Sequence, residues 1–72
     1  MERFLRYSLD HNREIRMIWI GPDGEMHEGK VVVEAMETDR VRIYVLRPPQ
    51  RMEIRTEDVL SCDYVSGDEG LN

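Results

Sequence analysis

The chain has 72 residues, a formal net charge of −5 and a single cysteine. So short a chain has room for one domain only, and one cysteine excludes both an intramolecular disulfide and a Cys-rich zinc site. The acidic charge argues against indiscriminate nucleic-acid binding, which depends on lysine and arginine neutralising phosphates.

The sequence predicts neither a secretory signal at its start nor a transmembrane helix. Residues 1–6 carry charges where a secretory signal needs an apolar run of about 7 to 15 residues. No stretch approaches the roughly 20 apolar residues of a transmembrane helix. We therefore expect a cytoplasmic protein with no membrane partner.

Residues 2–10 are expected to form a short helix. Leu5 and Leu9 are four residues apart and, with Phe4, give the helix one apolar face. Asn12 tolerates the left-handed conformation in which many helices end. Because so short a helix does not persist alone in water, we expect it to dock on a sheet.

Two strands joined by a tight turn should follow, over residues 14–20 and about 27–36. Residues 21–24, Gly-Pro-Asp-Gly, favour a hairpin because proline presets φ and glycine accepts a positive φ. Alternation predicts one apolar face on each strand, made of Ile15, Met17 and Trp19 on the first and of Val31, Val33 and Ala35 on the second.

Residues 40–46 and 51–55 predict a third and a fourth strand. Pro48 and Pro49 lie between them, and proline cannot donate ladder hydrogen bonds, so this segment should be a loop. The inward-facing residues of the two strands are expected to be Val41, Ile43, Val45, Met52 and Ile54.

The end of the chain predicts one helical turn and a last strand. Residues 56–58 have the polar composition of a helical turn, with Thr56 as its cap. Residues 59–65 have the pattern of a fifth strand, and the polar, acidic residues 66–72 are expected to be a disordered tail. Residues 1–65 should therefore form a mainly β fold, a small five-stranded SH3-like or Sm-like open barrel with an N-terminal α-helix.

Several segments resemble the bacterial WYL domain: residues 15–24, 31–33 and 43–47, then Ile54 and residues 58–60. The resemblance covers nearly the whole chain and is closer to the short stand-alone WYL-like proteins of Firmicutes, which consist of a helix and a barrel. It implies a domain that senses a ligand in transcriptional regulation, with nucleic acid among the candidate ligands. The Trp-Tyr-Leu triplet of the family would fall near residues 39–41, where only Val41 keeps the apolar character.

The main functional signal is a cluster of arginines in residues 40–55. Five arginines stand there against one glutamate, a local charge of +4. Guanidinium groups bind phosphate or carboxylate in a bidentate manner, and an exposed tyrosine offers a ring on which a base can stack. The sequence predicts a face that binds an anionic ligand or single-stranded nucleic acid through Arg40, Arg42, Tyr44, Arg47, Arg51 and Arg55.

Two other interpretations stay open. The arginines can pair across strands and only solvate an outer face, each pair contributing about 0.2 to 1 kcal/mol. Their carboxylate partners would be Glu34, Glu37, Asp39 and Glu53. Alternatively a protein partner or a second copy of the chain docks on a free strand edge or on the apolar row Ile18, Ile20 and Val32.

No catalytic or metal-binding constellation is predicted. Cys62 has no basic residue expected beside it, so it should be a small buried hydrophobe. His11 and His27 are expected to lie apart without a third ligand, which leaves no metal or cofactor site. His27 is expected to be a strand-edge residue, and Trp19 is expected in the core. We therefore expect a protein that is not an enzyme.

Overall fold

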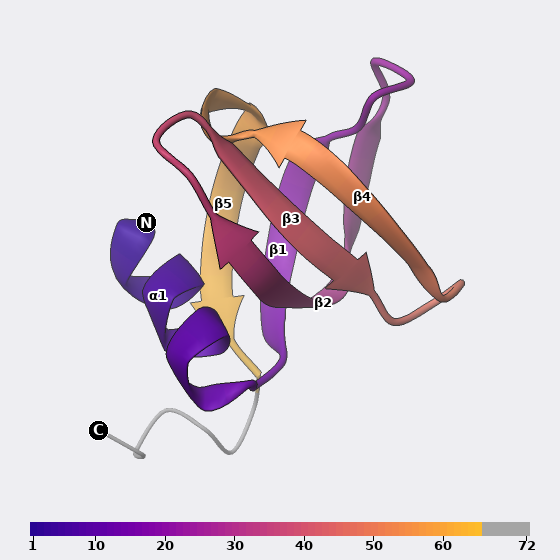
Figure 1. The fold of residues 1–72 in the computed structure, drawn as a ribbon. Coiled ribbons are helices and arrows are strands. Elements are labelled where there is room, and N and C mark those ends of the chain that lie inside the picture. The colour runs from indigo at the N-terminus through magenta and orange to yellow at the C-terminus, as the bar shows by residue number, and fades with distance from the viewer. Residues whose placement is uncertain (66–72) are drawn as a thin grey trace.

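A computed structural model describes residues 1–65 as one helix and a five-stranded antiparallel sheet with the strand order β4-β3-β2-β1-β5 (Figure 1). The elements are α1 (Glu2–His11), β1 (Ile15–Ile20), β2 (Met26–Met36), β3 (Arg40–Val45), β4 (Gln50–Arg55), the 3₁₀ turn η1 (Thr56–Asp58) and β5 (Val59–Tyr64). The predicted mainly β fold with an N-terminal helix is confirmed, and it is consistent with a small SH3-like or Sm-like open barrel.

The predicted tail lies outside the described residues. No helix within residues 1–65 is long and apolar enough to cross a membrane.

The long strand β2 belongs to both halves of the sheet. Its residues 26–31 pair with β1, and its residues 31–36 pair with β3. The sheet curves along this strand, so that β3 and β4 cross in front of β1 and β5 in Figure 1. The apolar core lies between the two halves.

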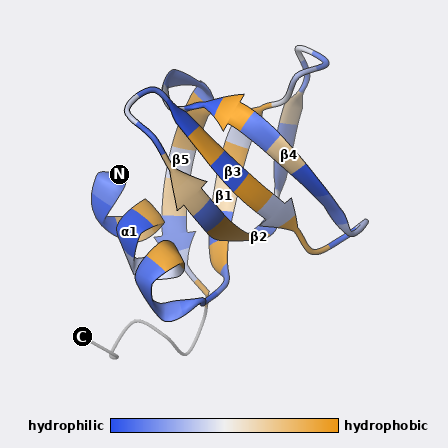
Figure 2. Cartoon of the chain, viewed as in Figure 1, coloured by the Kyte–Doolittle hydropathy of each residue, from blue (hydrophilic) through white to orange (hydrophobic). Residues whose placement is uncertain are grey.

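The alternation along the strands separates the core from the surface. Bands of hydrophobic and hydrophilic residues alternate along β3 and β4 in Figure 2. Trp19, 2% exposed, is a core residue as predicted. The buried apolar residues of the described chain are Leu5, Ile15, Met17, Trp19, Val31, Val33, Val41, Ile43, Val45, Ile54 and Val59.

The prediction that Ala35 faces inward with Val33 is wrong. The register of β2 and β3 shifts between these two residues, as in a β-bulge. Ala35 therefore pairs with the exposed Arg42, while Met36 pairs with the buried Val41 and packs against the core. A bulge adds one residue to one strand, and strict two-residue periodicity does not reveal it.

The predicted capping role of Thr56 is also wrong, although the helical turn itself is confirmed. The cap residue of η1 is Arg55, which makes no side-chain capping bond. The Thr56 hydroxyl is buried and has no hydrogen-bond partner within residues 1–65. Its backbone N–H donates to the carbonyl oxygen of Asp39 at 2.9 Å, so the chain before β3 holds the start of this turn.

The hairpin between β1 and β2 forms where the sequence predicts it. The N–H of Gly24 donates to the carbonyl oxygen of Gly21 at 2.9 Å, which closes the turn. Gly24 has a φ of 80°, a conformation that L side chains rarely adopt. The Asp23 carboxylate accepts a hydrogen bond from the N–H of Glu25 at 2.9 Å and fixes the exit of the turn.

Ser8 joins α1 to the sheet. It is fully buried, and its hydroxyl donates to the carbonyl oxygen of Arg13 at 2.7 Å. The same oxygen accepts the backbone N–H of Val33 at 2.8 Å, one residue before the bulge of β2. The helix ends at Asn12, whose φ of 54° turns the chain back towards β1. Helix, connector and sheet therefore meet at one side chain.

We predict that Ser8→Ala lowers the free energy of unfolding by about 1 to 3 kcal/mol, because it leaves a buried N–H and a carbonyl group without this partner. Urea denaturation followed by Trp19 fluorescence measures the change. Ser61→Ala is the matched control, since Ser61 is exposed and its loss should change stability very little. Equal stability of the two variants would contradict the role given to Ser8.

Candidate functional site

The hairpin formed by β3 and β4 carries most of the predicted arginine cluster on its outer side. We call this surface the hairpin face and define it as Arg40, Arg42, Tyr44, Arg51 and Arg55. The arginines are exposed and Tyr44 is half-buried. Across the two strands Arg40 lies opposite Arg55, Arg42 opposite Glu53, and Tyr44 opposite Arg51.

Two of these arginines pair with carboxylates on the sheet. Nη1 of Arg40 lies 3.2 Å from Oε1 of Glu53. Arg51 donates two hydrogen bonds to Glu34, at 2.9 and 3.3 Å, and the Glu34 carboxylate raises the pKa of Arg51. Cross-strand pairing is therefore confirmed for Glu34 and Glu53, at about 0 to 1 kcal/mol for each exposed pair.

Arg55 finds its partners in η1 rather than on a strand. Its guanidinium lies 3.1 Å from Glu57 and 3.2 Å from Asp58, and the bond to Asp58 raises the pKa of Arg55. Glu37 and Asp39, the other partners predicted for the arginines, form no ion pair within residues 1–65. The pairing prediction is wrong for these two because both precede β3 in the connecting turn.

Tyr44 is covered on one side by an arginine. The Cζ atom of Arg51 lies 5.1 Å from the centroid of the Tyr44 ring, a cation–π contact. An aromatic ligand on this side of the ring would have to stack on the guanidinium or displace it. On the hairpin face, therefore, the Arg51 guanidinium lies over the Tyr44 ring and is held there by Glu34.

Arg42 and Arg47 differ from the other arginines of the predicted site. Arg42 has no carboxylate partner in the described part of the chain, since its cross-strand neighbour Glu53 binds Arg40 instead. Arg47 lies in the turn after β3 and lines a pocket on the other half of the sheet. The structure thus brings the hairpin face together and separates Arg47 from it.

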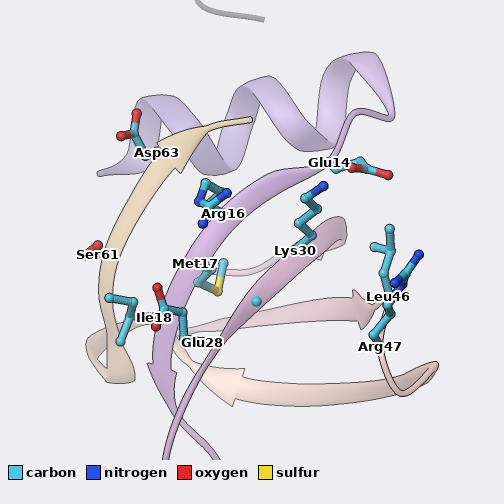
Figure 3. Close-up of a pocket in the computed structure, with 11 residues that line it drawn as sticks. Glu14, Arg16, Met17, Ile18, Glu28, Lys30, Leu46, Arg47, Ser61 and Asp63 are labelled. Atoms are coloured by element: carbon cyan, nitrogen blue, oxygen red, sulfur yellow. The ribbon is translucent and has the colours of Figure 1, made fainter. Parts of the chain in front are cut away.

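The pocket, with a volume of about 720 Å³, opens on the outer side of β1, β2 and β5 (Figure 3). Leu46 and Arg47 form one wall, where the N–H of Leu46 donates to the carbonyl oxygen of Lys30 at 3.1 Å. The strand register orders the other lining side chains in two rows. The first row is Asp63, Arg16 and Lys30, and the second is Ser61, Ile18 and Glu28.

The three cations of the pocket, Arg16, Lys30 and Arg47, form no ion pair within residues 1–65. Arg16 and Lys30 are cross-strand neighbours, and like charges in this position destabilise a sheet. Sequence reasoning missed Arg16 and Lys30 because it counted arginines along one segment. The outward phase of β1 exposes Arg16, but only the register with β2 places Lys30 beside it.

His27 has a larger structural role than that of the strand-edge residue expected from the sequence. Its ring stacks on Trp19, with 5.5 Å between ring centroids, and lies 3.1 Å from the Asp23 carboxylate. The N–H of Glu25 and the His27 ring lower the pKa of Asp23. A Cβ atom on Gly21 would approach the His27 ring to 2.8 Å, so the glycine leaves room for this contact.

Cys62 is half-buried and packs against the core. Burial raises the pKa of its thiol to about 11, opposite to the shift that a nucleophilic cysteine requires. Within residues 1–65, no three histidine, cysteine, aspartate or glutamate side chains are grouped to hold a metal ion.

We predict that Cys62 reacts slowly with a disulfide reagent in the folded protein. At pH 8 a pKa of about 11 leaves only about 0.1% of the thiol as thiolate, against roughly a quarter in the unfolded chain. The stronger nucleophilicity of a high-pKa thiolate offsets part of this difference, so we expect a rate about tenfold lower in buffer than in urea. Release of thionitrobenzoate measures both rates, and equal rates would show that the thiol is not shielded.

No family model, curated protein or solved structure matches this chain. The resemblance to the WYL domain stays a prediction from sequence positions. The function is therefore argued from the geometry of the hairpin face and the pocket.

Proposed function

We propose that this chain is a non-enzymatic, cytoplasmic binding and regulatory module of WYL-like type, which recognises an anionic ligand or single-stranded nucleic acid through the hairpin face. Arg42 is the observation that best supports this function. It is exposed, has no carboxylate partner in the described chain and stands between Arg40 and Arg51 on one strand pair. A ligand phosphate could take the place of the missing carboxylate.

The ion pairs of the neighbouring arginines orient them for such a ligand. Arg51 uses Nε and Nη2 to bind Glu34 and keeps further N–H donors for another acceptor. An exposed ion pair contributes only about 0 to 1 kcal/mol, so a phosphate can displace a carboxylate at small cost. The Arg51–Tyr44 stack adds a flat surface on which a base can lie.

We predict that a labelled single-stranded oligonucleotide binds the wild-type protein more weakly as salt rises. Arg42→Ala and Arg51→Ala should each weaken binding about 5- to 10-fold and reduce the salt slope by about 1, because each removes a phosphate contact. Fluorescence anisotropy over a salt series measures both quantities.

Arg6→Ala is the matched control, because Arg6 is an exposed arginine that pairs with Glu2 at 3.4 Å on α1, away from the hairpin. It should bind as the wild type does. The absence of salt-dependent binding, or an equal loss in the control, would rule out nucleic acid as the ligand of this face.

A protein-interaction or self-assembly module is the second candidate function. Among residues 1–65, β4 and β5 end the sheet and are paired on one side only, and unpaired strand edges are templates for another strand. Leu60 on β5 is 47% exposed, whereas the predicted apolar row of Ile18, Ile20 and Val32 is half-buried. The strand edges therefore support this candidate better than the row does.

If a β5 edge joins two copies of the chain, the sedimentation coefficient should rise with protein concentration, and Leu60→Lys should suppress this rise by placing a charge at the contact. Sedimentation velocity measures the effect. Glu57→Gln, which makes the same charge change of +1 outside the strand, is the control. A strict monomer with no co-purifying partner would reject the second candidate.

A further inference from the structure

We infer that the pocket on the outer side of β1, β2 and β5 is a second binding site, for a small organic phosphate whose body carries hydroxyl or amino groups. This inference goes beyond the proposed function, because the pocket lies on the other half of the sheet from the hairpin face. Its volume of about 720 Å³ lies within the range of about 300 to 1,000 Å³ that is typical of small-molecule sites.

The first argument is a comparison of two cross-strand pairs of like charge. Arg40 opposite Arg55 and Arg16 opposite Lys30 both bring two cations to neighbouring strands. Three carboxylates of β4 and η1 bind the first pair at 3.1 to 3.2 Å. No carboxylate of the described chain binds the second pair. An anion from solution would neutralise it.

One oxygen of the carboxylate opposite Arg16 is engaged locally. Asp63 is the cross-strand neighbour of Arg16 on β5, yet its Oδ1 accepts the backbone N–H of Tyr64 at 2.8 Å. In Figure 3 the side chains of Arg16 and Lys30 lie on the neighbouring strands β1 and β2, while Arg47 lies at the wall beside Leu46. One guanidinium, one ammonium and a second guanidinium thus line the same opening, donors that suit a phosphate.

The second row of the pocket suits the body of the ligand. Ile18 is half-buried and lies between Ser61 and Glu28, its cross-strand neighbours on either side. Its side chain offers an apolar floor for a sugar or a ring. The Ser61 hydroxyl and the Glu28 carboxylate are exposed beside that floor and can accept hydrogen bonds from hydroxyl or amino groups.

The charge balance of the pocket selects for a small ligand. Glu14, Glu28 and Asp63 line it together with the three cations, so its formal charge is zero. An extended polyanion such as nucleic acid would bring phosphates close to these carboxylates and be repelled. A compact phosphate with a hydrogen-bond-donating body meets cations at one row and an acceptor at the other. The pocket therefore suits a compact phosphate rather than an extended polyanion.

Calorimetric titration with adenosine 5′-monophosphate, glucose 6-phosphate, inorganic phosphate and adenosine tests the inference. Both organic phosphates should bind more tightly than inorganic phosphate, and adenosine, which lacks the anion, should bind at least about tenfold more weakly than its monophosphate. Arg16→Gln and Lys30→Gln should each reduce organic-phosphate affinity about tenfold. These residues are exposed, and circular dichroism verifies that the variants fold.

Arg42→Gln distinguishes this site from the hairpin face. It should leave organic-phosphate binding unchanged while it weakens oligonucleotide binding, and Arg16→Gln should do the reverse. Undiminished binding by Arg16→Gln and Lys30→Gln, loss of binding in Arg42→Gln, or no binding of any of the four compounds would overturn the inference. Binding of inorganic phosphate as tight as that of the organic phosphates would overturn the role of the second row.

Discussion

The two hydrogen bonds of the Ser8 hydroxyl are the constraint on which the remaining structure depends. They join the last turns of α1, the connector at Arg13 and the backbone of β2 at Val33. With the helix held there, Leu5 is buried in the apolar core with residues of the sheet. The phase of β2 is fixed at the same point, since Val33 directly precedes the bulge. The pairing of β2 with its neighbours then determines which side chains of β1 and β3 face solvent.

The hairpin face and the pocket both depend on which residues of each strand point outward. The alternation that buries Ile43 and Ile15 turns Arg42 and Arg16 outward, on different halves of one sheet. The two surfaces differ chemically in whether carboxylates lie at ion-pair distance from their cations. The hairpin face receives them from β2, β4 and η1 at ion-pair distance, whereas those of the pocket remain apart from its cations. Similar residue types therefore produce a largely paired surface in one place and, as far as the described residues extend, a surface with unpaired cations in the other.

Sequence periodicity predicted the helix, the strands and the hairpin face, because each depends on residues close together in the chain. β3 and β4 are joined by a short loop, so alternation along the two strands was enough to place Tyr44 and Arg51 on the same face. The pocket depends on the pairing of β1 with β5, which the sequence does not encode locally. Arg47 lies beyond the last residue of β3, so the structure separates it from the hairpin face although it is close to Arg42 in the sequence. The Ala35 and Thr56 errors have the same origin, a local irregularity within a regular pattern.

The sharing of β2 between the two halves of the sheet has a mechanical consequence. Val31 pairs with Ile15 on one side and with Val45 on the other, so it is the point at which both halves are joined to a single backbone. The two surfaces cannot reorient relative to each other without bending this strand near Val31. Because that residue is fully buried, such a bend would also disturb the packing around it. The angle between the two surfaces is therefore set by one peptide segment in the interior.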